Sequence, residues 1–185
     1  KLLEELAAVD SGQRVTRLGR SLARLPVDPR IGRMLIAAAE TGCLRELIVI
    51  AAALSVQDPR ERPPEKRAEA DEAHAQFADE RSDFIAWLKL WTFLEENRKH
   101  LTRRKFERLC QQHFLSASRV REWHDVQVQL RVQLHELGYR DNQQDADYAT
   151  LHRALLSGLL SHIGMRTQGN ARDYLGARNR HFFVF

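Results

Sequence analysis

Apolar residues recur every three or four positions along most of this chain, which is the spacing of one face of an α-helix. The longest such stripe lies between residues 114 and 137, with charged residues at the positions between its members. The stripe, which includes one glutamine, consists of Val120, Trp123, Gln127, Leu130, Leu134 and Leu137. Ser116 or Ser118 can cap the start of this helix, and Gly138 can adopt the left-handed turn that ends it. We therefore predict one long helix around which the others pack.

Shorter helices with their own start signals are predicted near the N-terminus. Thr16 can cap a helix that stops at Pro26. Gly19 lies inside that helix, where a glycine costs about 1 kcal/mol relative to alanine, so we expect a neighbouring backbone to approach it closely. Asp28 and Pro29 form a strong helix start, because the carboxylate accepts a hydrogen bond from a free amide and proline needs no donor at the first position.

The middle of the chain predicts further helices separated by a charged segment. Residues 44–54 are apolar almost throughout, so we expect a helix that is buried on most sides. Residues 65–81 are rich in charge and poor in large apolar side chains, which indicates a solvated helix or a mobile arm. Ser82 and Thr102 can cap two more helices, and Trp87 and Trp91 lie on the apolar stripe of the first.

The last part of the chain predicts one helix and one strand. The helix covers residues 148–163 and ends at Gly164. We expect its inward face to contain Leu151, Leu155, Leu156, Leu159 and Leu160. Residues 166–172 are polar and irregular, and residues 181–185 have the composition of a strand that is too short to build a sheet. The predicted fold class is therefore mainly α, a helical bundle with one orphan strand at its tail.

Composition sets wide bounds. The chain has 185 residues, 29% of them charged, and a formal net charge of +4, which permits an anionic partner without requiring one. Its two cysteines, Cys43 and Cys110, lie far apart in helical patterns, which favours buried thiols in a reducing compartment, and we expect the cytoplasm. No run approaches the roughly 20 apolar residues that a bilayer requires. Both ends interrupt patterned segments, so we expect a fragment of a longer protein.

Residues Asp71-Glu72-Ala73-His74 spell a motif of nucleotide hydrolysis, but their surroundings do not suit it. That motif works at the end of a buried strand, where its first acid holds Mg²⁺ beside a phosphate-binding loop. Here a charged helical pattern precedes it, and the sequence contains no Gly-x-x-x-x-Gly-Lys-Ser/Thr loop. We predict a surface helix without catalysis at this position.

Other catalytic or metal-binding patterns are missing from the sequence. The eight histidines form no His-Glu-x-x-His pair, there is no Cys-x-x-Cys, and no Gly-x-Ser-x-Gly indicates a hydrolase. His152 and His162 are too far apart on one predicted helix to share a metal, so we expect packed or solvated histidines. An independent enzyme therefore has no constellation of residues to support it.

Two clusters of basic residues remain as candidate sites. The first consists of Arg98, Lys99, His100, Arg103, Arg104, Lys105 and Arg108, and the second consists of Arg166, Arg172, Arg178, Arg180 and His181. Such groups can neutralise phosphates, whose contacts dominate the affinity of proteins for nucleic acids. A solvated surface is the competing interpretation. Arg119 and Arg121 lie near the start of the long helix, where free amides also favour anions.

With these motifs in place, the chain resembles the C-terminal accessory region of a DEAH-box RNA helicase of the bacterial HrpA type. The resemblance is carried, in family order, by Leu18-Gly19-Arg20-Ser21-Leu22-Ala23, Pro26-Val27-Asp28-Pro29, Ala53-Leu54-Ser55-Val56-Gln57-Asp58-Pro59, Arg119-Val120-Arg121-Glu122-Trp123, Ala154-Leu155-Leu156-Ser157-Gly158-Leu159-Leu160-Ser161-His162 and Tyr174-Leu175-Gly176-Ala177-Arg178-Asn179. It implies that residues 1–40 are the end of a degenerate winged helix, 41–173 a helical ratchet bundle, and 174–185 the start of an oligonucleotide-binding (OB) fold.

The same resemblance implies a function. Two RecA-like motor domains would hold ATP and Mg²⁺ outside this chain, which would itself carry no cofactor. The accessory region would then brace single-stranded RNA during 3′-to-5′ translocation, as a monomer in contact with its own motor domains and OB fold. The candidate contacts to the RNA backbone are Arg119, Arg121, Arg166, Arg178, Arg180, Arg104 and Lys105, on a scaffold that includes Trp87, Trp91, Trp123 and Leu155. The alternative is a helical module that binds other proteins and touches no nucleic acid.

Overall fold

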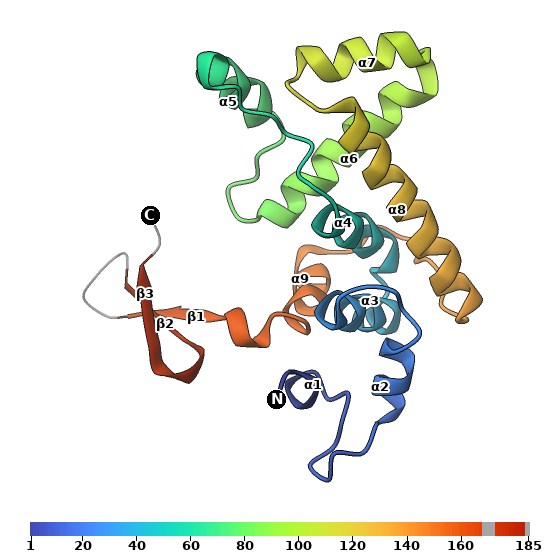
Figure 1. The fold of residues 1–185 in the computed structure, drawn as a ribbon, viewed down its shortest axis with the longest axis vertical. Coiled ribbons are helices and arrows are strands. Elements are labelled where there is room, and N and C mark those ends of the chain that lie inside the picture. The colour runs from blue at the N-terminus through green and yellow to red at the C-terminus, as the bar shows by residue number, and fades with distance from the viewer. Residues whose placement is uncertain (168–172, 184–185) are drawn as a thin grey trace. The chain divides into compact units, whose positions relative to one another are not determined.

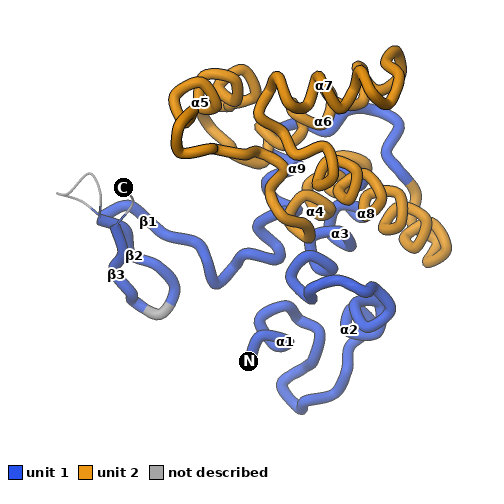
Figure 2. The backbone as a smooth tube through the Cα atoms, turned by 45° about the horizontal axis from the view of Figure 1, so that its top comes forward, with its two compact units in different colours: residues 1–44, 141–185 blue, residues 45–140 orange. Residues whose placement is uncertain are grey.

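The computed structural model describes residues 1–167 and 173–183 except for the side chain of Arg178, and it is mainly helical as predicted (Figure 1). The chain divides into two units (Figure 2). Unit 1 combines residues 1–44 with residues 141–185, and unit 2 contains residues 45–140.

Unit 1 contains the predicted N-terminal helices, and their caps are the predicted ones. Its helices are α1 (Leu2–Glu5), α2 (Arg17–Leu22), α3 (Pro29–Thr41) and α9 (Tyr148–Leu156). The Thr16 hydroxyl accepts a hydrogen bond from the Gly19 amide at 3.0 Å, and the Asp28 carboxylate accepts one from the Arg30 amide at 2.8 Å. Gly42 ends α3 with a φ of +80°, a conformation that costs glycine little.

Two glycines in unit 1 lie where no side chain fits. A Cβ atom on Gly19 would overlap the carbonyl oxygen of Ala8, which confirms the predicted close approach of a backbone. A Cβ atom on Gly158 would overlap the carbonyl oxygen of Arg30 in α3. The absence of a side chain at Gly19 lets α2 pack directly on the backbone at Ala8, and its absence at Gly158 lets the segment after α9 pack directly on α3.

The prediction of one helix over residues 148–163 is wrong in its second half. The helix ends at Leu156, and a separate 3₁₀ turn follows at Leu160–His162. Because Gly158 packs directly on α3, the chain bends there instead of continuing its helical path. Leu151 and Leu155 are buried as predicted, but Leu156 and Leu160 are 44% and 51% exposed and do not face inward.

The orphan strand predicted at the tail belongs to a small sheet, so that prediction also needs correction. Its strands are β1 (Gly164–Arg166), β2 (Asp173–Gly176) and β3 (Arg180–Phe183), antiparallel and in the order β1-β2-β3. Tyr174 pairs with Phe182 across β2 and β3, and their rings stack with centroids 5.6 Å apart. Gly164 and Gly176 leave room for the Phe182 ring. Strands of three and four residues, with glycine as a partner, show too little alternation to be found in a sequence.

Unit 2 is built around helices that the apolar pattern located correctly. They are α4 (Leu44–Ser55), α5 (Arg67–Ala75), α6 (Asp83–His100), α7 (Arg103–Gln112) and α8 (Ala117–Glu136), with a 3₁₀ turn at Pro64–Lys66. The predicted long helix is α8, which is continuous, and the turn at Gly138 has a φ of +93°. Its predicted stripe from Val120 to Leu134 is buried, whereas Val128 and Val132 on the opposite face are exposed.

Three tryptophans form the centre of unit 2. Trp123 of α8 is fully buried, and its indole nitrogen donates a hydrogen bond of 2.9 Å to the carbonyl oxygen of Val49 in α4. The rings of Trp87 and Trp91, one turn apart on α6, meet the Trp123 ring edge-on with centroids 5.3 and 4.9 Å away. Offset and edge-to-face contacts of this kind stabilise cores beyond the area that they bury. Trp87 and Trp123 are therefore core residues, as predicted, whereas Trp91 is only half-buried.

Helix α5 is anchored by buried side chains, which corrects the prediction of a solvated helix or a mobile arm over residues 65–81. Ala70, His74 and Phe77 are buried, and the Phe77 ring lies 5.1 Å from that of Phe93. The histidine Nε2 lies 3.2 Å from the carbonyl oxygen of Phe114. One alanine, one histidine and one phenylalanine make a stripe too weakly apolar to stand out in a sequence.

The tetrapeptide at residues 71–74 is therefore partly exposed and partly buried. It is helical, and its acids Asp71 and Glu72 are exposed as predicted, but His74 is buried and is not a surface residue. In the described part of the chain, no three His, Cys, Asp or Glu side chains are arranged to hold a metal ion.

Both cysteines are free and buried, as predicted. Burial raises the pKa of the Cys110 thiol to about 11, because a low-polarity environment disfavours the thiolate. Among the described residues, no helix is both long enough and apolar enough to span a membrane.

Candidate nucleic-acid interface

The predicted RNA contacts are distributed over both units. Unit 2 contains Arg104 and Lys105 on α7 and Arg119 and Arg121 on α8, and unit 1 contains Arg166 and Arg180 on the sheet. The side chain of Arg178, which also belongs to the predicted set, lies outside the described residues, as does Arg172.

Arg119 is engaged in holding unit 2 together. Its guanidinium donates a hydrogen bond of 3.1 Å to the carbonyl oxygen of Asp58 and lies 4.0 Å from the Glu61 carboxylate. The same loop is tied to the turn between α7 and α8 by the amide of Glu61, which donates to Phe114 O, and by the amide of Ser116, which donates to Pro59 O, both at 2.8 Å. Arg119 thus fixes the start of α8 to the loop at residues 58–61.

A second arginine, which the sequence did not single out, completes this loop. The Arg60 side chain donates hydrogen bonds to the Asp58 carboxylate from Nε, at 3.0 and 3.2 Å, and from Nη2, at 2.7 Å. Its guanidinium lies 4.4 Å from the centroid of the Trp87 ring. Partial burial on its own would raise the pKa of Asp58, but the hydrogen bonds from Arg60 outweigh it and lower that pKa. The spacing Asp-Pro-Arg is the local signal that could have indicated this pair.

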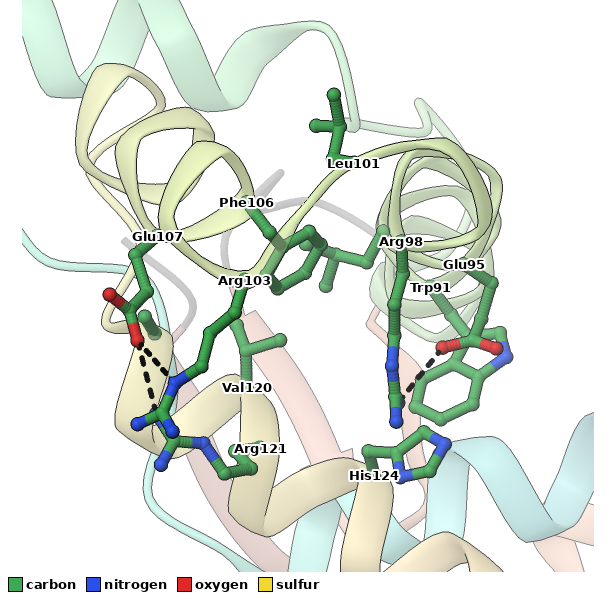
Figure 3. A pocket seen from close by; sticks show the side chains of 12 residues that line it. Trp91, Glu95, Arg98, Leu101, Arg103, Phe106, Glu107, Val120, Arg121 and His124 are labelled. Carbon is green, nitrogen blue, oxygen red and sulfur yellow. Dashed lines mark hydrogen bonds and ion pairs between the residues drawn. The ribbon is translucent and has the colours of Figure 1, made fainter.

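Arg121 lies on the rim of a groove between α6, α7 and α8 (Figure 3). This groove, here called the α6–α8 groove, has a volume of about 380 Å³. Its lining consists of Trp91, Leu94, Glu95, Arg98, Leu101, Arg103, Phe106, Glu107, Ala117, Val120, Arg121 and His124. Arg103 and Arg121 both approach Glu107, at 3.1 and 3.8 Å, and Arg98 lies 3.6 Å from Glu95.

The remaining members of the first basic cluster are exposed. Arg104 and Lys105 lie on the exposed side of α7, away from the groove lining, and Lys99 and Arg108 are also exposed. The loop at Leu101 and Thr102 brings the end of α6 and the start of α7 together, as the sequence predicted for one helix junction. This junction is a solvated basic surface that an anion can reach.

Unit 1 contains a second hollow, here called the Arg30–Arg180 hollow, with a volume of about 400 Å³. It is lined by Lys1, Leu2, Glu5, Arg30, Ser161, His162, Ala177 and Arg180. Arg30 contributes to this lining, and its Nε atom is buried in the protein without a hydrogen-bond partner in the described structure. The Ser161 hydroxyl lies 3.2 Å from His162 Nδ1.

The composition of this hollow suits an anion. Two guanidinium groups, a hydroxyl and an imidazole surround it, against the single carboxylate of Glu5. Guanidinium groups bind phosphate oxygens through pairs of N–H donors. Sequence reasoning found Arg180 but not Arg30, since an arginine at the start of a helix 150 positions earlier gives no local sign of proximity.

The rest of the second basic cluster does not line this hollow. Arg166 is exposed on β1. His181 lies 3.1 Å from the Asp173 carboxylate, and the hydrogen bond from His181, together with one from Thr167, lowers the pKa of Asp173. The Asp173 carboxylate is therefore engaged by His181 and Thr167. It does not neutralise the positive charge of Arg180.

Comparisons with known proteins match the chain over its whole length. The winged-helix part of the helicase-associated domain (HA2) matches residues 1–27, and its ratchet-like part matches residues 28–87. The chain is 48% identical, over its full length, to the ATP-dependent RNA helicase HrpA homolog of Haemophilus influenzae and to the ATP-dependent RNA helicase HrpA of Escherichia coli. These matches cover 15% and 14% of the two relatives.

A more distant relative matches in the same way. The chain is 32% identical, over 89% of its length, to the pre-mRNA-splicing factor ATP-dependent RNA helicase prp22 of Schizosaccharomyces pombe, of which it covers 14%. The chain thus spans about one seventh of the length of these relatives. The domain boundaries predicted at residues 40 and 173 stay a prediction.

Proposed function

The chain belongs to the helicase-associated (HA2) region of the HrpA-type DEAH-box RNA helicases, and on that premise we propose that it braces single-stranded RNA while motor domains elsewhere in the polypeptide move the strand. A brace has to hold any sequence that passes. It therefore needs contacts to phosphates, which are the same at every nucleotide, and not to base edges.

The observation that carries this proposal is the Arg30–Arg180 hollow. Its cations converge on one concave place, where the guanidinium groups of Arg30 and Arg180 would bind one phosphate together. The exposed basic junction of α6 and α7 offers Arg104 and Lys105 as further contacts to the strand.

The proposal places ATP hydrolysis outside this chain. Motor domains of the helicase would hold ATP and Mg²⁺, and the helical bundle would contribute only by preventing the strand from slipping back. In keeping with this division, the sequence lacks a phosphate-binding loop of the Gly-x-x-x-x-Gly-Lys-Ser/Thr type.

Titration with RNA tests the proposed contacts. A fluorescent oligouridine is titrated with the chain at two salt concentrations, and fluorescence anisotropy reports binding. We expect the affinity of the wild type to fall as salt rises, because bound phosphates release counterions. Arg180→Glu, and separately Arg30→Gln, should weaken binding roughly tenfold and make the salt dependence shallower by about 0.7 in the logarithmic slope for each lost contact.

Arg24→Glu is the matched control, because Arg24 is an exposed arginine of the same unit that does not line the hollow. It changes the net charge as much as Arg180→Glu does and should leave the affinity nearly unchanged. Circular dichroism checks that each variant keeps its helices. Equal losses in Arg180→Glu and Arg24→Glu, or a strong preference for one RNA sequence, would contradict the proposal.

The alternative interpretation, a helical module that binds proteins and no RNA, predicts a different outcome for the same titration. Any binding of oligouridine would then be weak, and Arg180→Glu and Arg24→Glu would reduce it equally, because only the net charge would matter.

A further inference from the structure

The α6–α8 groove has an apolar floor that no part of the described chain fills. Val120 is buried at its base and Phe106 is half-buried along its wall (Figure 3). Buried Leu94 and half-buried Leu101 also belong to its lining. A volume of about 380 Å³ accommodates one large apolar side chain together with part of its backbone. Pockets of this kind receive the anchor residues that dominate protein–protein affinity.

The rim of the groove is cationic. It carries Arg98, Arg103 and Arg121 against Glu95 and Glu107, and two of the arginines share the one carboxylate of Glu107. Three positive groups against two negative groups leave an excess of one positive charge, and each guanidinium keeps N–H donors that the glutamates do not use. A partner with carboxylates beside its anchor residue would complement this rim.

One wall of the groove is rigid. The Trp91 ring is held from one side by the Trp123 ring, with centroids 4.9 Å apart, and the imidazole of His124 stacks on it with an angle of 10° and centroids 6.0 Å apart. Trp123 is in turn fixed by its hydrogen bond to Val49. A pocket whose wall is already ordered costs its ligand less conformational entropy on binding.

These features favour a protein segment over RNA as the occupant. A nucleobase would bind by stacking on a flat aromatic face, but His124 already stacks on the Trp91 ring. Leucine and valine side chains on the floor match an aliphatic or aromatic residue better than they match a base.

We propose that the α6–α8 groove binds a short segment of a partner protein in which a bulky apolar residue is flanked by acidic residues. The apolar residue would lie on the floor between Phe106 and Val120, and its acidic neighbours would bind Arg98 and Arg121. This binding does not depend on the RNA contacts proposed for unit 1, so the HA2 region would hold a protein partner in addition to the strand.

A selection from a displayed library of random peptides tests this proposal on the full-length protein that contains the chain. Recovered peptides should share a large apolar residue between aspartates or glutamates. Their synthetic versions should bind the wild type and lose roughly tenfold or more in affinity for the rim variant Arg98→Glu/Arg121→Glu. They should lose as much for Ala117→Trp, whose indole would fill the groove.

Arg108→Glu is the control, because Arg108 is exposed on α7 and does not line the groove, and binding to it should equal binding to the wild type. The rim variant changes exposed side chains only and should fold. It therefore tests the proposed peptide site even if Ala117→Trp does not fold. The proposal fails if the selection recovers no peptide, if the peptides lack acidic residues, or if they bind the rim variant as well as the wild type.

Oligouridine separates the two classes of occupant. We expect it to leave the bound peptide in place. If oligouridine displaces the peptide, and the rim variant weakens RNA as much as it weakens the peptide, then the groove belongs to the RNA path and the proposal of a protein partner is wrong. Failure of the Arg180→Glu titration would not affect this test.

Discussion

At the scale of single residues, Gly19 shows how a missing side chain positions a helix. It lies within α2, where alanine is ordinarily about 1 kcal/mol more favourable than glycine. The carbonyl group of Ala8 occupies the place where a Cβ atom of residue 19 would lie, and the Val15 side chain is also close to that place. The close packing of α2 against this backbone therefore outweighs the helix propensity.

The substitution Gly19→Ala should reverse the usual effect of alanine in a helix. We expect it to lower the free energy of unfolding by about 1–3 kcal/mol, because the new methyl group forces α2 away from Ala8. Urea unfolding followed by circular dichroism measures the change. Arg17→Ala, at an exposed position of the same helix, is the control and should change stability by less than about 0.5 kcal/mol. A Gly19→Ala variant as stable as the wild type would show that the close contact has no energetic weight.

Single residues also decide which partners each cation has. Arg119 donates to the carbonyl of Asp58, and Arg121 shares Glu107 with Arg103, whereas Arg30 keeps a buried N–H without an acceptor. The sequence identified the basic clusters but could not assign these partners. The partner of each arginine depends on contacts between residues far apart in the chain. A count of charges along the sequence does not reveal these contacts.

At the scale of elements, local signals predicted the helix starts well. Thr16, Asp28 and Ser82 each accept the amide hydrogen bond expected of an N-cap, because capping depends only on residues a few positions away. Thr102 and Ser116 do precede α7 and α8 as predicted, but their side chains accept no such bond. The end of α9 and the strands β1 and β2 were not predicted. The end of α9 is set by packing on Arg30, and the strands pair around Phe182, so both depend on tertiary contacts.

Helix α5 offers a test of element packing through pH. Its end is anchored where Phe77, Phe93 and His113 meet, with His113 at 4.9 Å from the Phe93 ring and 6.3 Å from the Phe77 ring. Burial lowers the pKa of His113, and the nearby His74 lowers it further. Gln76 Nε2 lies 3.1 Å from His113 Nδ1, which can accept a hydrogen bond only when the imidazole is neutral.

The unfolded chain therefore binds a proton at the ordinary histidine pKa of 6.5, while the folded chain binds it only at lower pH. The stability due to neutral His113 is complete above that value and is lost as pH falls through the folded pKa. Urea unfolding at pH 7.5 and at about pH 5.5 should show this loss in the wild type and a smaller one in His113→Phe. His100→Gln, at an exposed position of α6, should behave like the wild type. Equal pH dependence in His113→Phe and the wild type would show that His113 does not couple protonation to folding.

At the scale of the whole molecule, the proposed function assigns the movement of RNA to motor domains and the holding of RNA to this chain. The chain spans about one seventh of its HrpA relatives, and its described residues form the Arg30–Arg180 hollow and the α6–α8 groove. The family was predicted from short blocks such as the one around Gly19 and Asp28, whose structural roles the fold confirms. The arrangement of Arg30 beside Arg180 appeared only in the folded chain.

The most direct test of bracing is the number of base pairs unwound per ATP hydrolysed by the full-length helicase that carries this chain. Unwinding of a 3′-tailed RNA duplex and release of phosphate are measured in the same reaction for the wild type, Arg180→Glu and Arg24→Glu. We expect Arg180→Glu to lower this ratio, because the RNA strand slips back between cycles of ATP hydrolysis. The rate of ATP hydrolysis by Arg180→Glu without RNA should equal that of the wild type. The ratio for Arg24→Glu should also equal the wild-type ratio. A ratio for Arg180→Glu equal to that of the wild type would contradict the account.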